Sequence, residues 1–78
     1  MKPIKVDLHG HKHENVRNVV IRAIENHYLE SEAVLDFISG HSPDMKSIVI
    51  EIINEYGLEF RIGDFSGVNQ GFIRVYMY

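Results

Sequence analysis

The sequence predicts a single α/β domain of 78 residues, built as a two-layer sandwich with the element order βαβαββ. Three observations predict this class. Two segments carry apolar residues at three- to four-residue spacing, which is typical of amphipathic helices. Four segments of strand length carry alternating or nearly continuous apolar residues. Each of the first two strand segments is followed by a helical one, and no linker or repeat interrupts the chain, so residues 1–78 are expected to fold as one domain.

The first half of the chain supplies two strands and a helix. Residues 4–8 alternate apolar and polar side chains, as expected of a half-buried strand. From residue 13 to residue 31 the apolar side chains recur every three or four positions, which predicts a helix. Residues 33–39 form a nearly continuous apolar run, broken by Asp36, and have the length of an interior parallel strand.

The second half supplies a helix and two strands. Ser42 and Pro43 match an N-cap followed by proline at the first helical position, and Gly57 marks the end of that helix. Alternating residues then predict strands at 58–62 and 72–77. The length of the connection between these two strands suits a long hairpin.

The order of the elements predicts how the sheet is assembled. Strand–helix–strand connections are right-handed in nearly all proteins, so two of them running in the same direction put both helices on one face. Strands 1 to 3 are then parallel and adjacent in chain order, and strand 4 is antiparallel at the edge of a four-stranded mixed sheet. A reversal of direction after the second strand would instead put one helix on each face, and the pattern alone leaves that alternative open.

Composition and charge exclude several classes of protein. The net charge of −3 argues against a strongly basic nucleic-acid clamp, although it is compatible with a small local basic patch. With no cysteine, the chain forms no disulfide and no zinc-thiolate site. No apolar run approaches the ~20 residues that span a bilayer, and the first residues lack the apolar stretch of a signal peptide. We therefore expect a cytoplasmic protein without a membrane partner.

A candidate site lies where the first strand ends. Asp7 and His9 point to the same side of that strand, about two strand rises (~6.5 Å) apart, and Gly10 allows the backbone to turn sharply. Ligands of open α/β sheets bind outside the carboxyl ends of parallel strands, where the N–H groups of the helix N-termini also favour phosphate. An Asp at such a position can equally serve only as a cap. Further polar residues expected at this edge are His11, His13, Ser39, His41, Ser42, Asp64 and Asn69.

The segment Val6–Gly10 (Val-Asp-Leu-His-Gly), followed by Glu14, resembles the Leu-Asp-x-His-Gly box that opens the small MutS-related (Smr) domain. The resemblance extends over essentially the whole chain through the βαβαββ order. It implies a nucleic-acid module in which many members are metal-dependent endonucleases that nick DNA or cleave RNA. Asp7 and His9 match the residues that the family implicates in catalysis.

The second box of the family is normally Thr-Gly-x-Gly or His-Gly-x-Gly, and its glycine backbone is expected to approach the nucleic acid. Ser39, Gly40 and His41 match its first three positions, whereas Ser42 replaces the second glycine and Pro43 follows. This departure affects the close backbone contact that the family's box implies. The residues expected to contact nucleic acid are Gly10, His11, Lys12, Ser39, Gly40, His41, Ser42 and Lys46.

The expected activity is metal-assisted hydrolysis of a phosphodiester bond. Asp7 is a hard oxygen ligand that suits Mg²⁺ or Mn²⁺, and His9 is expected to orient or deprotonate the attacking water. Lys12 and Lys46, each near the start of a helix, add local positive charge.

Two other functions fit the same sequence. A DNA- or RNA-binding module without catalysis would hold phosphates with basic side chains and stack bases on Tyr76 or Tyr78, for which edge-strand packing is the alternative interpretation. A cluster of histidines would instead suit a transition-metal site, although Gly10 interrupts their alternation. The basic side chains are Lys5, Lys12, Arg17, Lys46, Arg61 and Arg74, and the histidines are His9, His11, His13 and His41.

Overall fold

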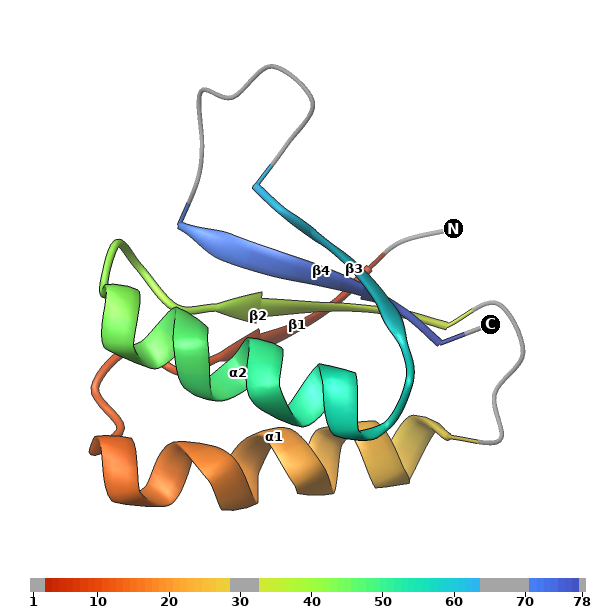
Figure 1. Cartoon of the computed structure of the whole chain (residues 1–78), viewed down its shortest axis with the longest axis horizontal. Helices are drawn as coiled ribbons and strands as arrows, with labels where there is room; N and C mark the ends of the chain where they lie inside the picture. The colour runs from red at the N-terminus through yellow and green to blue at the C-terminus, as the bar shows by residue number, and fades with distance from the viewer. Residues whose placement is uncertain (1–2, 29–32, 64–70, 78) are drawn as a thin grey trace.

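The computed structural model describes residues 3–28, 33–63 and 71–77, and Figure 1 shows their arrangement. The element order is βαβαββ, as the sequence predicts. Helix α1 ends at His27, earlier than the predicted residue 31. Within the described ranges, no helix is long and apolar enough to cross a bilayer. The elements are β1 (Ile4–Asp7), α1 (His13–His27), β2 (Val34–Ile38), α2 (Pro43–Glu55), β3 (Glu59–Ile62) and β4 (Phe72–Tyr76).

Both helices cover the same face of the sheet, so the molecule has two layers (Figure 1). The helices lie side by side and are joined by polar contacts. Arg17 of α1 donates from Nη2 to Oε1 of Glu55 in α2 (2.8 Å), and the hydroxyl of Tyr56 donates to Oε2 of Glu25 (3.1 Å). The prediction that both helices lie on one face is confirmed, and the alternative with one helix on each face is wrong.

Local sequence signals set the two ends of α2. Ser42 Oγ accepts a hydrogen bond from the backbone N–H of Met45 (3.2 Å), as an N-cap does. At the other end Gly57 adopts a φ of +69°, and the N–H of Leu58 donates to the Ile53 carbonyl (3.1 Å), which closes a Schellman motif. The helix therefore begins directly after the loop that follows β2.

The strand order corrects the predicted one. The sheet has the order β1-β2-β4-β3, so β4 lies inside the sheet and β3 forms an edge. The predicted edge position of the fourth strand and the predicted pairing of the second strand with the third are both wrong. β1 pairs in parallel with β2, and β4 is antiparallel to both β2 and β3. β3 thus runs in the direction of β1 and β2, as predicted, without pairing with them.

Two features of β4 explain its interior position. Ile73 and Val75 are fully buried (0% exposed), whereas Ile62 at the end of β3 is 40% exposed, so β4 gains more from an interior position. Arg74 of β4 lies opposite Asp36 of β2 and neutralises the one charge in that apolar strand. A hairpin between β3 and β4 is compatible with either order, and burial together with this ion pair favours the observed one.

The core lies between the sheet and the two helices, with Phe37 of β2 as its largest fully buried side chain. Side chains alternate along each strand, so the other half of the strand residues faces away from the helices. We call this second surface of the sheet the open face. It consists of Lys5, Asp7, Val34, Asp36, Ile38, Glu59, Arg61, Phe72, Arg74 and Tyr76.

Candidate functional site

The first two strands end side by side, and this brings together the loops that follow them. Asp7 pairs with Ile38, and the N–H of Leu8 donates to the Ile38 carbonyl (3.0 Å). The loop of residues 8–12 therefore starts beside the loop of residues 39–42, and each loop leads into the N-terminus of a helix (Figure 1, left). We call these two loops, with the first turns of α1 and α2, the carboxyl edge.

Asp7 fixes the turn that follows β1. Its Oδ1 accepts a hydrogen bond from the backbone N–H of His9 (2.8 Å), the N–H of His11 donates to the Leu8 carbonyl (3.1 Å), and Gly10 has a φ of +88°. The structure keeps Asp7 and His9 together in one turn, and both residues are exposed. The carboxylate therefore caps this turn and also remains at the surface, where a ligand can reach it.

The loop after β2 is held by its serines. Ser39 is 5% exposed, and its hydroxyl donates to the Gly40 carbonyl (3.0 Å). The backbone N–H groups of Ser39 and Gly40 both donate to the Gly71 carbonyl (3.0 and 2.9 Å), which ties this loop to the start of β4. The hydroxyl of Ser42 serves as the N-cap of α2. Ser39 and Ser42, both predicted to contact nucleic acid, thus use their hydroxyls for contacts within the protein.

The backbone conformation at positions 10 and 40 favours glycine. Their φ values of +88° and +65° lie in the left-handed region, which residues with a side chain rarely adopt. A Cβ built on either residue would meet no other atom of the described residues within 4 Å. The backbone of both turns is therefore open to the approach of a ligand.

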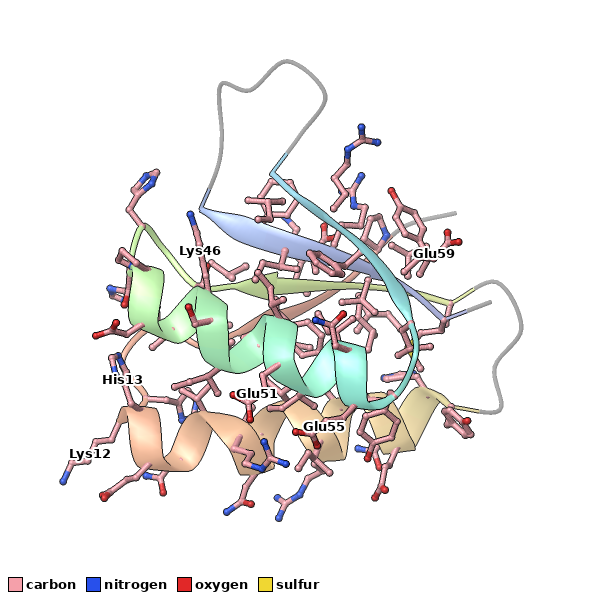
Figure 2. The ribbon with its side chains drawn as sticks, viewed as in Figure 1. Lys12, His13, Lys46, Glu51, Glu55 and Glu59 are labelled. Atoms are coloured by element: carbon pink, nitrogen blue, oxygen red, sulfur yellow. The ribbon has the colours of Figure 1, made fainter. Side chains whose placement is uncertain are left out.

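Lysine and histidine side chains surround these turns. Figure 2 shows Lys12 and His13 at the start of α1 and Lys46 near the start of α2. Glu14 and Asp44 add carboxylates to the same first helical turns. At these first turns the two lysines and the two carboxylates therefore balance in formal charge. The other exposed histidines of this edge are His9, His11 and His41.

A divalent metal would find few protein donors here. Among the described residues, no three His, Asp or Glu side chains lie close enough together to hold a metal ion. Asp7 offers one carboxylate, which suits a Mg²⁺ or Mn²⁺ that retains most of its waters and bridges to a substrate phosphate. A transition-metal site would need several imidazoles at one point, and no such group is formed by His9, His11, His13 and His41.

A groove of about 440 Å³ is shared by the carboxyl edge and the open face. It contains the Asp36–Arg74 ion pair, in which Nε and Nη2 of Arg74 donate to Oδ1 and Oδ2 of Asp36 at 2.8 and 2.9 Å. Sequence reasoning placed Arg74 among the phosphate-binding residues and assigned Asp36 no partner. A charged residue inside an apolar strand was the signal for such a pair. The groove is lined by Lys5, Asp36, Ile38, Gly40, His41, Gly71, Phe72 and Arg74.

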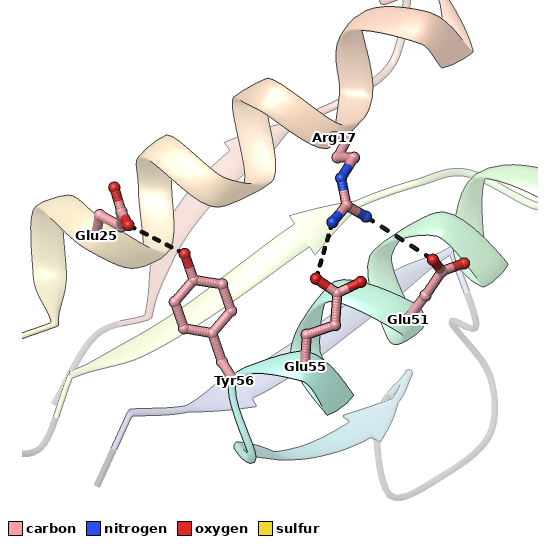
Figure 3. Close-up of polar contacts among 5 residues, drawn as sticks. All are labelled: Arg17, Glu25, Glu51, Glu55 and Tyr56. Atoms are coloured by element: carbon pink, nitrogen blue, oxygen red, sulfur yellow. Dashed lines mark hydrogen bonds and ion pairs between the residues drawn. The ribbon is translucent and has the colours of Figure 1, made fainter.

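Arg17, another predicted phosphate contact, is engaged between the helices. It lies 2.8 Å from Glu55 and 3.8 Å from Glu51 (Figure 3). The hydrogen bond to Glu55 holds the pKa of the Arg17 guanidinium above its ordinary value. Nearby, desolvation and the hydrogen bond to Glu25 raise the pKa of the Tyr56 phenol. Arg17 is therefore a structural contact of the helix layer.

The remaining predicted contacts lie on the open face or outside the described residues. Lys5 is exposed beside Asp36 on the open face, and Tyr76 is half-buried there. Three predicted contacts lie outside the described ranges, namely Asp64, Asn69 and Tyr78.

Comparisons with protein-family models, with curated proteins and with solved structures find no match.

Proposed function

We propose that this domain binds nucleic acid at the carboxyl edge and, with Mg²⁺ or Mn²⁺, hydrolyses a phosphodiester bond there as an Smr-type endonuclease. One observation carries the proposal. The pairing of Asp7 with Ile38 puts the turn of Asp7 and His9 beside the turn of Gly40, with both helix N-termini at the same edge. A carboxylate, imidazoles and helix N–H groups then lie around one surface, and these are groups that bind phosphate and transfer protons.

Phosphate binding rests on the lysines and the first turn of α1. Lys12 is the N-cap of α1 and makes no side-chain cap hydrogen bond, whereas Ser42 already accepts from the backbone of α2. The N–H groups of the first turn of α1 are therefore the better donors to a phosphate oxygen. Lys12 and Lys46 add the positive charge that attracts a polyanion to a chain whose net charge is −3.

The cleavage step rests on Asp7 and His9. The hydrogen bond from the His9 N–H fixes the Asp7 carboxylate at the end of β1, where it would hold the metal ion. When bound, Mg²⁺ or Mn²⁺ neutralises charge on the phosphoryl oxygens. The exposed imidazole of His9 is the group that would accept the proton of the attacking water, because a neutral imidazole carries one unprotonated nitrogen.

A binding module without catalysis is the second candidate, and one observation favours it. Ser42 stands where the family's second glycine box has a glycine, and its side chain is committed to capping α2. The backbone at this position is therefore less open than a glycine would leave it. Binding would use the same lysines and the same helix N-terminus.

Binding is tested with a fluorescently labelled oligonucleotide and anisotropy. Lys46→Gln is expected to weaken binding about twofold to tenfold and to lower the slope of log affinity against log salt by about one. Arg22→Gln removes the same charge from the exposed middle of α1 and is expected to leave binding unchanged. Equal affinities for the wild type and Lys46→Gln would contradict binding at this edge.

Cleavage is tested on plasmid DNA and structured RNA with Mg²⁺, with Mn²⁺ and with a chelator. Asp7→Asn keeps an oxygen that can accept from the His9 N–H, so it removes the charge while retaining the turn. We expect Asp7→Asn and His9→Ala to lose cleavage and keep binding. Cleavage at the wild-type rate by both variants would remove Asp7 and His9 from the reaction, and binding without cleavage in either metal would select the binding module.

A further inference from the structure

The groove shared by the open face and the carboxyl edge is not used by the cleavage step. Its volume of about 440 Å³ is in the usual range for small-ligand sites, roughly 300–1,000 Å³. Its walls combine two kinds of residue. Ile38 and Phe72 are apolar, whereas Lys5, Asp36 and Arg74 are charged. Such a lining suits a ligand that has a flat apolar part and a charged part.

The groove contains a rigid flat surface. The two hydrogen bonds between Asp36 and Arg74 fix the plane of the guanidinium, because a carboxylate and a guanidinium bind each other in one plane. The guanidinium carbon of Arg74 lies 5.5 Å from the centroid of the Phe72 ring. Guanidinium planes and aromatic rings are the surfaces on which proteins stack unpaired bases. Because the Arg74 guanidinium lies over one face of the Phe72 ring, a base would stack on the exposed surface of this pair, which the ion pair with Asp36 preorganises.

The charge of the groove complements a phosphate. Lys5 and Arg74 lie on either side of Asp36 in the strand register, so two cations face one carboxylate. Arg61 follows Arg74 in the same row across the sheet. The row of Lys5, Asp36, Arg74 and Arg61 therefore holds three cations and one carboxylate, and it is locally positive although Asp7 and Glu59 balance it elsewhere on the open face.

The groove continues into the proposed cleavage site. Gly40 and His41 line the groove and also belong to the carboxyl edge, and Gly71 holds Gly40 in place through its carbonyl (2.9 Å). A strand whose base lies in the groove would therefore continue along the turn of Gly40 toward Asp7. The exposed imidazole of His41 lies along that path.

We propose that this groove binds one unpaired nucleotide, with its base stacked on Phe72 and Arg74 and its phosphate near Lys5 and His41. This inference rests on the proposed function, because it assumes that the domain binds nucleic acid. It adds that the substrate is single-stranded. A paired base cannot enter the groove, because its faces are stacked on neighbouring pairs and its edge is hydrogen-bonded to its partner.

The test measures the affinity of a labelled single-stranded oligothymidylate, about ten nucleotides long, in a chelating buffer that prevents cleavage. Phe72→Ala is expected to weaken binding about tenfold, the effect of removing one stacked base. Phe72→Trp retains a stacking surface and is expected to bind as the wild type does. Val34→Ala is the matched control, because it shortens an apolar side chain on the same face outside the groove. Circular dichroism and the urea midpoint of each variant show that it is folded.

Two further arms separate the inference from the proposed function. Thymidine monophosphate is expected to compete with the oligothymidylate in the wild type, and a duplex of the same length is expected to bind more weakly and to be insensitive to Phe72→Ala. Wild-type affinity of Phe72→Ala and of the more conservative Phe72→Leu for the single strand would overturn the nucleotide site. If Lys46→Gln weakens binding while Phe72→Ala and Phe72→Leu do not, only the nucleotide site in the groove is refuted. If Phe72→Ala and Phe72→Leu weaken binding while Lys46→Gln does not, binding at the carboxyl edge is refuted and the nucleotide site in the groove is retained.

Discussion

Replacing either residue of the Asp36–Arg74 ion pair is expected to lower the free energy of unfolding by more than the loss of an exposed ion pair would. The reason is that Asp36 is buried and accepts two hydrogen bonds from Arg74. Asp36→Asn keeps the shape of the side chain and removes its charge. Arg74→Met keeps an apolar stem and removes the cation. The pair also crosses between β2 and β4, which only the observed strand order makes neighbours. The same measurements therefore test the sheet topology.

The exposure of the two side chains sets the magnitude. Breaking a fully buried ion pair costs about 3–5 kcal/mol. The Arg74 side chain is 31% exposed, so it can reach water when its partner is lost, and Asp36→Asn is expected to cost about 2 kcal/mol. The Asp36 side chain is 7% exposed and has no such access, so Arg74→Met is expected to cost about 3 kcal/mol. The double variant leaves no charge without a partner and is expected to cost about 2 kcal/mol, well below the sum of the single costs.

Urea denaturation followed by circular dichroism measures these costs. For a small domain the free energy of unfolding falls by about 1 kcal/mol or more per molar urea. The urea midpoint should therefore fall by up to about 2 M for Asp36→Asn and up to about 3 M for Arg74→Met. A cost below about 0.5 kcal/mol for Arg74→Met would refute the role of the pair. Additive costs in the double variant would refute the contact between β2 and β4.

Three further predictions concern local contacts. Ser42→Ala is expected to lower the free energy of unfolding by about 1 kcal/mol through loss of the N-cap, with the exposed Ser47→Ala as control, and equal urea midpoints for the two variants would contradict this. Gly40→Ala is expected to cost about 1–2 kcal/mol in the same assay because of its φ of +65°, although the space beside it is open; an unchanged midpoint would count against that conformation. The raised pKa of the Tyr56 phenol stabilises the folded state below the ordinary tyrosine pKa of about 10, and this contribution is lost as pH rises through the raised value. Tyr56→Phe should therefore lose less stability than the wild type on going to alkaline pH, and parallel alkaline curves of the unfolding free energy would contradict this.

Local patterns predicted most of the fold, because their causes are local. The stripe of α2 ends where Gly57 adopts a positive φ, and Ser42 begins that helix by accepting from a backbone N–H three residues later. The right-handed crossover rule then placed both helices on one face. Two predictions were made for Ser42. Capping preferences predicted a structural role, and the family resemblance predicted a contact with nucleic acid. The observed hydrogen bond, from the Met45 N–H to Ser42 Oγ, is the structural one.

The strand order and the groove depend on residues that are distant in the chain. A hairpin permits β4 on either side of β3, and the choice is made by burial of Ile73 and Val75 and by a pair separated by 38 residues, Asp36 and Arg74. The groove exists because that order puts Phe72 of β4 next to Ile38 of β2. Neither the strand order nor the contact between Phe72 and Ile38 leaves a periodic pattern in the sequence, so neither could be predicted from one sequence.

Chemical-shift mapping with the single-stranded oligothymidylate tests most directly whether nucleic acid binds at the carboxyl edge. In a chelating buffer, the backbone amide signals of residues 9–14, 40–42 and 44–46 are expected to move on addition of the oligonucleotide. The signals of Asn18, Arg22 and Asn26 on the outer side of α1 are expected to stay in place. Shifts confined to the helix layer, with the signals of the two turns unchanged, would contradict binding at this edge.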